Sequence, residues 1–288
     1  MTQSARLAAL AAAVLFSTGG AAVKVGSFTA PQVSGLRSGI AALTLLFWYR
    51  RNLAWTRWTV PASIAYAATL TLYVVASRWT TAANAIFLQS TAPLYLLPLS
   101  PLILGERVSR RDVEYLVTIA FGMMLCFLGQ TRATTTAPNP AIGNLLAAGS
   151  GVFWALTLVA LRYLNRDDPR TGSTGYGDPG ITAVVAGNAL AFLVALPWMF
   201  PTSRALPIEW LTILYLGVIQ IALAYVCLMR ATSRLPALEV SLLLLLEPVL
   251  NPVWAWIIRD EVPGHWTVAG GAVILGATAI RTWRSRPA

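Results

Sequence analysis

The sequence predicts an all-α integral membrane protein whose ten transmembrane helices form a 5+5 inverted-topology repeat. Three observations lead to this prediction. First, 57% of the 288 residues are hydrophobic and only 11% are charged, which is about half the charge of an ordinary soluble domain. Second, the chain contains ten apolar segments that approach or reach the roughly twenty residues needed to span a bilayer. Third, a proline and a glutamate recur at the same spacing in two of these segments.

We place the spans at residues 7–27, 31–49, 60–78, 82–104, 112–130, 142–164, 180–200, 208–230, 236–258 and 266–283. Strands of a membrane barrel alternate over only about ten residues, so these longer apolar runs favour helices. The polar connection at 165–179 is rich in turn-forming residues, which predicts a mobile loop. Residues 1–22 resemble a secretory signal, but further spans follow, so we expect an uncleaved first helix.

The cations predict the orientation of the chain, because Lys and Arg near helix ends favour the cytoplasm. With the N-terminus inside, fifteen of the 21 cations fall on the cytoplasmic side and five on the opposite side. We therefore expect both termini in the cytoplasm. The net charge of +10 does not indicate nucleic-acid binding, which needs cations clustered on a water-facing surface. These cations instead separate apolar runs.

Two prolines anchor the internal repeat. Pro93 lies in an apolar segment that ends at Glu106, and Pro248 lies in one followed by Glu261. Each glutamate follows its proline by 13 positions, and the prolines are 155 positions apart. Because both glutamates lie at segment ends, we expect them to cap helices or to pair with neighbours such as Arg110 rather than to bind substrate.

The repeat divides the chain into residues 1–137 and 138–288, with five spans in each half. Because five is an odd number, the second copy enters the membrane from the opposite face. The two halves are then related by an axis in the membrane plane. Inverted repeats of this kind build alternating-access carriers, whose substrate site lies near mid-membrane at the repeat interface.

Motifs in both halves resemble the EamA-type transporters of the drug/metabolite transporter superfamily. They are Phe16-Ser-Thr-Gly19 with Lys24, Leu36-Arg37, Pro93 through Gly105-Glu106, Gly143, Trp154, Leu246-Glu247-Pro248-Val249 and Asp260-Glu261. The resemblance implies a ten-helix carrier of metabolites, often an exporter, in the bacterial cytoplasmic (inner) membrane. The chain looks most similar to bacterial amino-acid exporters, including the aromatic amino-acid branch. It departs from the small multidrug-resistance relatives, because it has no acidic residue before Glu106.

Glu247 is the sharpest candidate for a transport site. A charged side chain at the bilayer centre costs about 2.5 kcal/mol or more, so it must face the interior of the bundle, water or a partner. We expect it to bind a substrate amino group or to exchange a proton. The structural alternative is a hydrogen bond near Pro248, whose ring disrupts the helix ladder. Asn251 and Trp254 share its helix face, which suits a zwitterionic or aromatic solute and equally suits helix packing.

Further candidates lie on other spans. In the fourth span we expect Thr91 and Tyr95 to face the cavity, on a stripe from which Gln89 and Ser90 point away. Three aromatic residues are candidate cavity walls, with packing as the alternative: Tyr73, Trp154 and Tyr225. Four prolines are candidate hinges or gating points, because proline bends helices: Pro93, Pro98, Pro248 and Pro252. We expect Lys24 and Arg37 to reach the headgroups, with anion contact as the alternative.

The sequence therefore predicts a monomeric secondary carrier that exports small organic metabolites, amino acids including aromatic ones, through a cavity between the repeats. Its partners are the solute and the lipid bilayer. We expect no cofactor and no metal, because the single histidine, His265, falls in an exposed turn. No ATPase phosphate-binding motif occurs.

One alternative is an organic-anion antiporter for sugar phosphates or nucleotide sugars, which needs several cavity-facing cations. A more remote one is an intramembrane enzyme, for which convergent acid and base groups are scarce.

Overall fold

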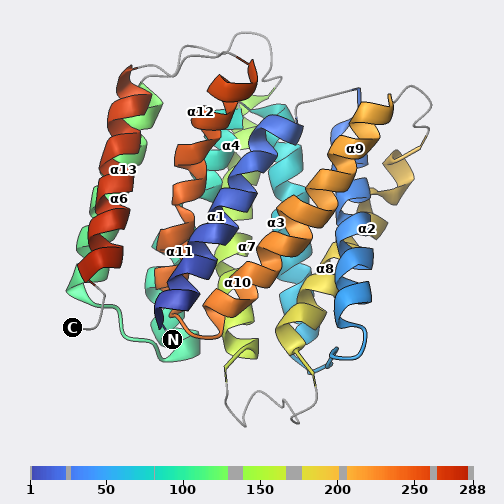
Figure 1. Cartoon of the computed structure of the whole chain (residues 1–288), viewed down its shortest axis with the longest axis horizontal. Helices are drawn as coiled ribbons and strands as arrows, with labels where there is room; N and C mark the ends of the chain where they lie inside the picture. Colours follow the sequence, from blue (N-terminus) through green and yellow to red (C-terminus); the bar gives the residue numbers. More distant parts are fainter. Residues whose placement is uncertain are drawn as a thin grey trace.

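The computed structural model describes residues 2–23, 27–80, 82–128, 139–166, 177–200, 206–259 and 265–284. Over these ranges the chain is helical apart from short connections, and one isolated bridge pairs Leu53 with Asp178. The helices run up and down a single bundle, in which α1 begins and α13 ends at the same end (Figure 1). The predicted all-α class is confirmed.

The helices of the first half are α1 (Thr2–Val23), α2 (Ala30–Tyr49), α3 (Thr59–Trp79), α4 (Ala82–Gln89), α5 (Ala92–Leu99), the π-helix η1 (Ser100–Leu104) and α6 (Arg110–Leu128). Those of the second half are α7 (Pro140–Leu164), α8 (Pro179–Ala195), the short η3 (Leu196–Trp198), α9 (Pro207–Tyr215), the π-helix η4 (Leu216–Leu223), α10 (Ala224–Thr232), α11 (Ala237–Leu244), α12 (Leu246–Arg259) and α13 (His265–Arg284). Helix therefore lies over every predicted span.

Four helical segments of the described chain are long and apolar enough to cross a membrane, judged by length and composition. They are Thr59–Ser77, Ala141–Leu164, Pro179–Trp198 and Pro207–Thr232. The predicted mobile loop at 165–179 lies mostly outside the described residues. Its first residues are held in place, since the Asn165 amide donates to Thr232 Oγ1 at 3.0 Å.

Two of the predicted spans are broken helices. The fourth breaks between Gln89 and Ala92, and the ninth breaks at Leu245. Each break directly precedes a helix that carries a proline in its first turn, Pro93 in α5 and Pro248 in α12. Proline has no N–H and its ring clashes with the carbonyl four residues earlier, so an α-helix does not continue through it undisturbed. The upstream helices α4 and α11 end 155 positions apart, at the offset that separates the two prolines.

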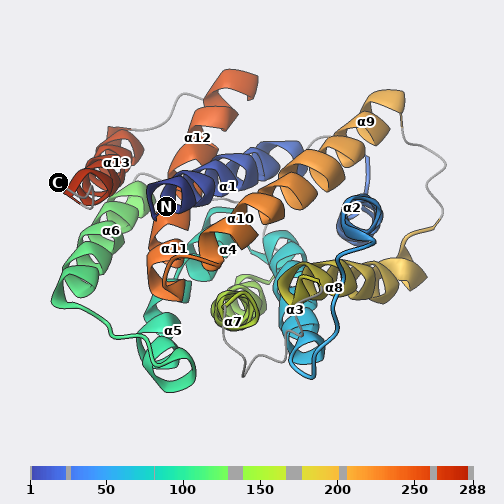
Figure 2. The same ribbon diagram turned by 60° about the horizontal axis from the view of Figure 1, so that its bottom comes forward.

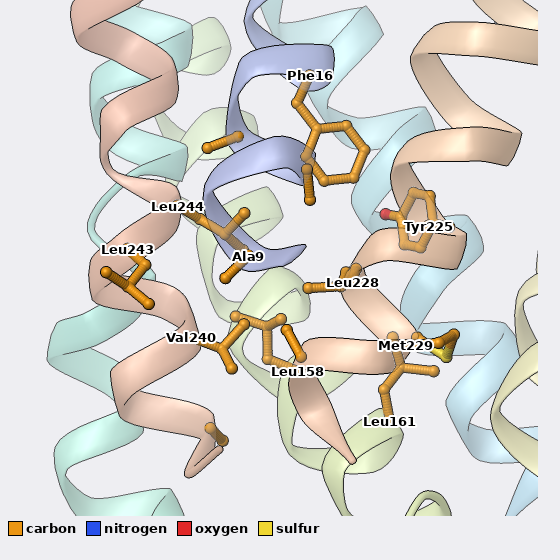
Figure 3. Close-up of a cluster of buried hydrophobic side chains, with 14 of the residues drawn as sticks. Ala9, Phe16, Leu158, Leu161, Tyr225, Leu228, Met229, Val240, Leu243 and Leu244 are labelled. Carbon is orange, nitrogen blue, oxygen red and sulfur yellow. The ribbon is translucent and has the colours of Figure 1, made fainter. Parts of the chain in front are cut away.

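The main core lies where α1, α7, α10 and α11 meet (Figure 3). Figure 3 labels side chains from all four helices in it, including Ala9, Leu158, Leu228 and Val240. Around this centre α3 packs along α7 and α8, and α2 packs along α8 and η4. The pair α6 and α13 lies side by side at one edge of the bundle (Figures 1 and 2).

Glu106 joins the two halves of the chain through buried polar contacts. Its Oε1 accepts from Arg162 Nε and from Arg166 Nη2, both at 2.8 Å, and its Oε2 accepts from the backbone N–H of Ala237 at 3.0 Å. The prediction that Glu106 pairs with Arg110 is wrong. Arg110 Nε instead pairs with Glu114 Oε1 on the exposed face of α6, at 3.1 Å. Glu106 therefore ties the end of η1 to the ends of α7 and α11.

Candidate functional site

The two helix breaks face a common hollow in the centre of the bundle. It is lined by both breaks and by the face of α7 between them, with Gln89, Ser90, Trp154, Ser241 and Glu247 as its main polar and aromatic side chains. Its cavity volume is about 20 Å³, enough for about one water molecule. An amino acid does not fit in this space, so any solute that passes through must separate the surrounding helices.

Glu247 lies in the first turn of α12 at the edge of this hollow and is partly buried. Its carboxylate has no hydrogen-bond or ion-pair partner among the residues that the structure describes. The other described carboxylates all have one; they are Glu106, Asp112, Glu114, Asp178, Glu209 and Glu239. A semi-buried acid without a partner is costly in the membrane, which makes Glu247 available to a ligand or a proton.

An aromatic cluster extends from the hollow into the bundle. Phe16 of α1 and Trp154 of α7 meet edge to face, with ring centroids 6.4 Å apart. Tyr225 of α10 contacts Phe16 at 5.1 Å and Tyr66 of α3 at 4.8 Å, also edge to face. This is the favoured geometry for aromatic pairs. Figure 3 shows Phe16 and Tyr225 turned toward each other. The cluster therefore joins four helices around the predicted residues Trp154 and Tyr225.

Tyr73 belongs to the same region. It is partly buried on α3, seven residues and therefore about two turns beyond Tyr66, on the same helix face. Tyr73 and Tyr225 both lie within electrostatic range of Glu247. Thus four of the predicted site residues, Trp154, Tyr73, Tyr225 and Glu247, are brought together.

Other predicted residues lie away from the lining of the hollow. The Thr91 hydroxyl donates to the Leu88 carbonyl at 2.6 Å and so satisfies the broken end of α4. Tyr95 is half-buried and packs against the main core. The Trp254 indole N–H donates to Ser17 Oγ at 2.8 Å, which links α12 to α1. Asn251 lies on α12, but its side chain falls outside the described residues.

The four predicted hinge prolines occupy different environments. Pro93 lines the hollow, and Pro248 lies partly buried in the first turn of α12. Pro98 lies in the interior of α5 and is exposed. Pro252 lies in α12, and its side chain is outside the described residues. Pro93 and Pro248 are therefore the two that accompany the helix breaks.

The expectation that Gln89 and Ser90 point away from the cavity is wrong. Both line the hollow, and Gln89 Nε2 donates to Ser150 Oγ at 3.0 Å. The prediction that Thr91 and Tyr95 face the cavity treated the fourth span as one continuous helix. The helix is broken between Gln89 and Ala92, so helical periodicity does not carry across the break. Ser241 of α11 was missed altogether. The sequence did contain a signal for it. Ser241 lies seven residues before Pro248, and the residues that line the hollow from the fourth span lie at similar distances before Pro93.

Gly151 lets α7 approach the α4 break closely. A Cβ added there would lie 2.7 Å from the Leu88 carbonyl oxygen and 3.2 Å from that of Gln89. These are backbone atoms, so they cannot turn aside as a side chain could. Gly149, two residues earlier, has Leu72 Cδ1 at 3.8 Å as its nearest neighbour, an ordinary contact.

Gly151→Ala is therefore expected to lower the free energy of unfolding by about 1–3 kcal/mol, the usual cost of overpacking. The matched control is Gly149→Ala in the same helix, which is expected to leave stability unchanged or to raise it slightly through helix propensity. Thermal unfolding of the two purified variants in one detergent measures the difference. Equal melting temperatures would contradict the close approach of α7 to the break.

Comparisons with known proteins found a matching family, similar sequences and a similar fold. The model of the EamA-like transporter family matches residues 3–128 and, separately, residues 141–283. A crystal structure of a protein 23% identical in sequence superposes with a TM-score of 0.78 and covers 98% of this chain and 99% of its own. At this identity the likeness concerns the fold alone.

Two curated relatives carry names that concern transport. The chain is 29% identical over 287 residues to the pseudopaline exporter CntI of Pseudomonas aeruginosa strain UCBPP-PA14, covering 96% of this chain and 95% of the relative. It is 24% identical to the uncharacterized transporter YdfC of Bacillus subtilis, covering 70% of this chain and 63% of that protein. Both similarities concern membrane transport and leave the solute of this chain to be inferred from its site.

Proposed function

The chain belongs to the EamA-like transporter family, and from that premise we propose that it is a secondary carrier that exports small organic metabolites, amino acids including aromatic ones, across the bacterial inner membrane. The single observation that carries this proposal is the position of Glu247. A carboxylate without a partner among the described residues lies beside an aromatic cluster, in a hollow between two broken helices. Broken helices at the centre of a bundle are the usual setting for substrate sites in carriers with inverted repeats.

We propose ten spans arranged as two inverted five-helix repeats, residues 1–137 and 138–288. The family model matches the chain twice, once on each half. The helix breaks recur at the offset of the two prolines. Both observations support a duplication in which corresponding helices follow in the same order in each half.

The packing of the helices supports a two-fold relation between these halves. Exchanging the halves turns α1 into α7 and turns α3 into the helix built from α9, η4 and α10. The contact of α3 with α7 is matched by that of α1 with α10, and the contact of α3 with α8 is matched by that of α2 with η4. The pairs α2 with α8 and α6 with α13 map onto themselves. The proposed axis therefore passes near these two pairs.

Alternating access would open and close the hollow from the two faces in turn. The structure supports a starting point in which the hollow is closed, with space for about one water. At the end of the bundle where α1 begins, Glu106 holds both halves together through Arg162 and Arg166. At the other end, Gln32 Nε2 donates to the Met199 carbonyl at 3.0 Å. Opening toward either face would break one of these sets of contacts.

The proposed orientation has both termini in the cytoplasm. The end of the bundle at which α1 begins and α13 ends (Figure 1) is the end where α2 finishes and the exposed Arg50, Arg51 and Arg57 follow. Cations of this kind favour the cytoplasmic face. We propose that the carrier acts as a monomer, because both helix breaks and all four aromatic helices of the site come from one chain.

Solute flux tests the proposal. Purified protein reconstituted into proteoliposomes loaded with labelled phenylalanine, threonine or other members of an amino-acid panel is expected to accelerate efflux over protein-free liposomes. An exchangeable external solute should speed efflux further, because the carrier then returns with solute bound instead of returning empty. Absence of flux across amino acids and amphipathic metabolites would overturn the proposal.

A further inference from the structure

Arg37 is a buried cation at the centre of the bundle. It lies in the eighth position of α2 and is only 4% exposed. The expectation that it reaches the lipid headgroups is therefore wrong. Its Nε has no hydrogen-bond partner in the described structure. The sequence held the signal, since an arginine in the middle of an apolar segment is rare and usually faces the interior of a bundle.

The groups that face Arg37 are phenols. Its guanidinium lies within electrostatic range of Tyr66, Tyr73 and Tyr225. Tyr66 is committed elsewhere, because its hydroxyl accepts from Asn188 Nδ2 at 2.8 Å. No acidic side chain of the described residues forms an ion pair with Arg37. A guanidinium carries five donors and keeps its charge in proteins, so a buried arginine in this state lacks a counter-anion.

Two serines of α2 near Arg37 have unused hydroxyls. Ser34 lies one turn before Arg37 on the same helix face, and Ser38 is the next residue, about 100° further round the helix. Both hydroxyls are buried without a hydrogen-bond partner in the described structure, whereas buried polar atoms are normally paired. Arg37 Nε and the Ser34 hydroxyl, on one face of α2, therefore indicate a place for a ligand that supplies acceptors.

Arg37 and Glu247 share two phenolic neighbours. Tyr73 and Tyr225 are within electrostatic range of both charges, yet the two charges form no ion pair with each other. Trp154 bridges the region, since it lines the hollow beside Glu247 and contacts Tyr225 with ring centroids 6.4 Å apart. Within the described residues, an unpaired positive group and an unpaired negative group therefore share an aromatic neighbourhood.

We propose that Arg37 binds the carboxylate of the transported solute, while Glu247 binds its amino group and the aromatic cluster contacts its apolar body. The inference rests on the proposed carrier function and deepens it, because it assigns the substrate class as zwitterionic and carboxylate-bearing. Arginine suits this role because its planar fork matches a carboxylate with two parallel hydrogen bonds. The Ser34 hydroxyl, one turn from Arg37 on the same helix face, can donate to the same group when the helices move apart.

Ligand binding to Arg37→Gln tests the assignment. The probes are the amino acids of the flux panel, each compared with its amide, which lacks the carboxylate charge, for example phenylalanine and phenylalaninamide. Wild-type protein is expected to be stabilised against thermal unfolding by the amino acid and about tenfold less effectively by the amide. In Arg37→Gln the preference for the carboxylate should disappear. Arg50→Gln, the same change at the exposed residue that follows α2, should keep the wild-type preference.

Efflux of the same probes separates this inference from the function on which it rests. One outcome is that Arg37→Gln abolishes carboxylate-dependent binding but the wild type shows no flux. That outcome would support the site and overturn the carrier function. Flux that Arg37→Gln leaves unchanged would overturn the site and leave the carrier function intact. Failure of every carboxylate probe to stabilise the wild type would also overturn the site. Loss of an unpaired buried charge should not lower the ligand-free melting temperature, so a large decrease would mark Arg37 as structural.

Discussion

Glu247→Gln is expected to reduce solute flux about tenfold or more while the bundle stays folded. A hydrogen bond to a charged group contributes about 1.5–3 kcal/mol, and each 1.4 kcal/mol corresponds to a factor of ten. Glutamine keeps the shape of the side chain but can neither carry the negative charge nor exchange a proton. Because Glu247 has no ion-pair or hydrogen-bond partner within the described structure, the substitution breaks no internal contact there.

The measurement compares initial efflux rates and melting temperatures of the wild type and Glu247→Gln at equal amounts of reconstituted protein. Glu114→Gln is the control, since it makes the same chemical change on the exposed face of α6. Its flux should equal that of the wild type. If Glu247→Gln transports at the wild-type rate, or if it fails to fold, then Glu247 has a structural role and the proposed site is wrong.

Glu106→Gln is expected to destabilise the bundle by about 3 kcal/mol, because removing one partner of a buried ion pair leaves the other charge uncompensated. The side chains of Glu106 and Arg162 are only 12% and 15% exposed, and Arg166 shares the same carboxylate oxygen. Two guanidinium groups would thus lose their counter-charge. The contacts join η1, α7 and α11, so the loss should affect both halves together.

Thermal unfolding in one detergent checks this result, and the chain supplies a matched control. The pair of Arg110 and Glu114 is 93% and 63% exposed, and surface pairs four residues apart on a helix contribute only about 0.3–0.5 kcal/mol. Glu114→Gln should therefore shift the melting temperature far less than Glu106→Gln. Comparable shifts for the two variants would mean that the contacts of Glu106 do not hold the halves together.

The helical class could be predicted from the sequence because long apolar runs have few alternatives in a membrane. The proposed repeat rests on a related property of the chain. Pro93 and Pro248 disturb helices wherever they occur, so their equal spacing from Glu106 and Glu261 carried structural information. Both helices that contain these prolines are broken directly ahead of them.

The faces of the broken helices could not be predicted in the same way. Periodicity extrapolates along an uninterrupted helix, and the break at Ser90 and Thr91 resets the rotation of every residue that follows. Gln89 at the end of α4 and Ser90 in the break line the hollow, whereas Thr91 closes the end of α4 with its hydroxyl. Glu247 and Trp154 were easier to place, since a carboxylate and an indole in apolar segments stand out without any knowledge of helix phase.

Long-range partners were beyond reach of the sequence. Glu106 lies four positions from Arg110, which made a local pair reasonable, but the carboxylate instead meets Arg162 and Arg166 from the second half. Arg37 was misplaced for a different reason. An arginine within an apolar segment either extends to the headgroups or faces the interior of the bundle, and the packing of α2 against α8 and η4 encloses it.

We propose that this chain moves a small organic solute through the hollow between its two helix breaks. The most direct test is efflux of labelled amino acids from proteoliposomes that contain wild-type protein, Glu247→Gln or no protein, measured side by side. We expect rapid, saturable efflux with the wild type and rates near those of protein-free liposomes with Glu247→Gln. Equal efflux from all three preparations, or equal efflux from the wild type and the variant, would contradict it.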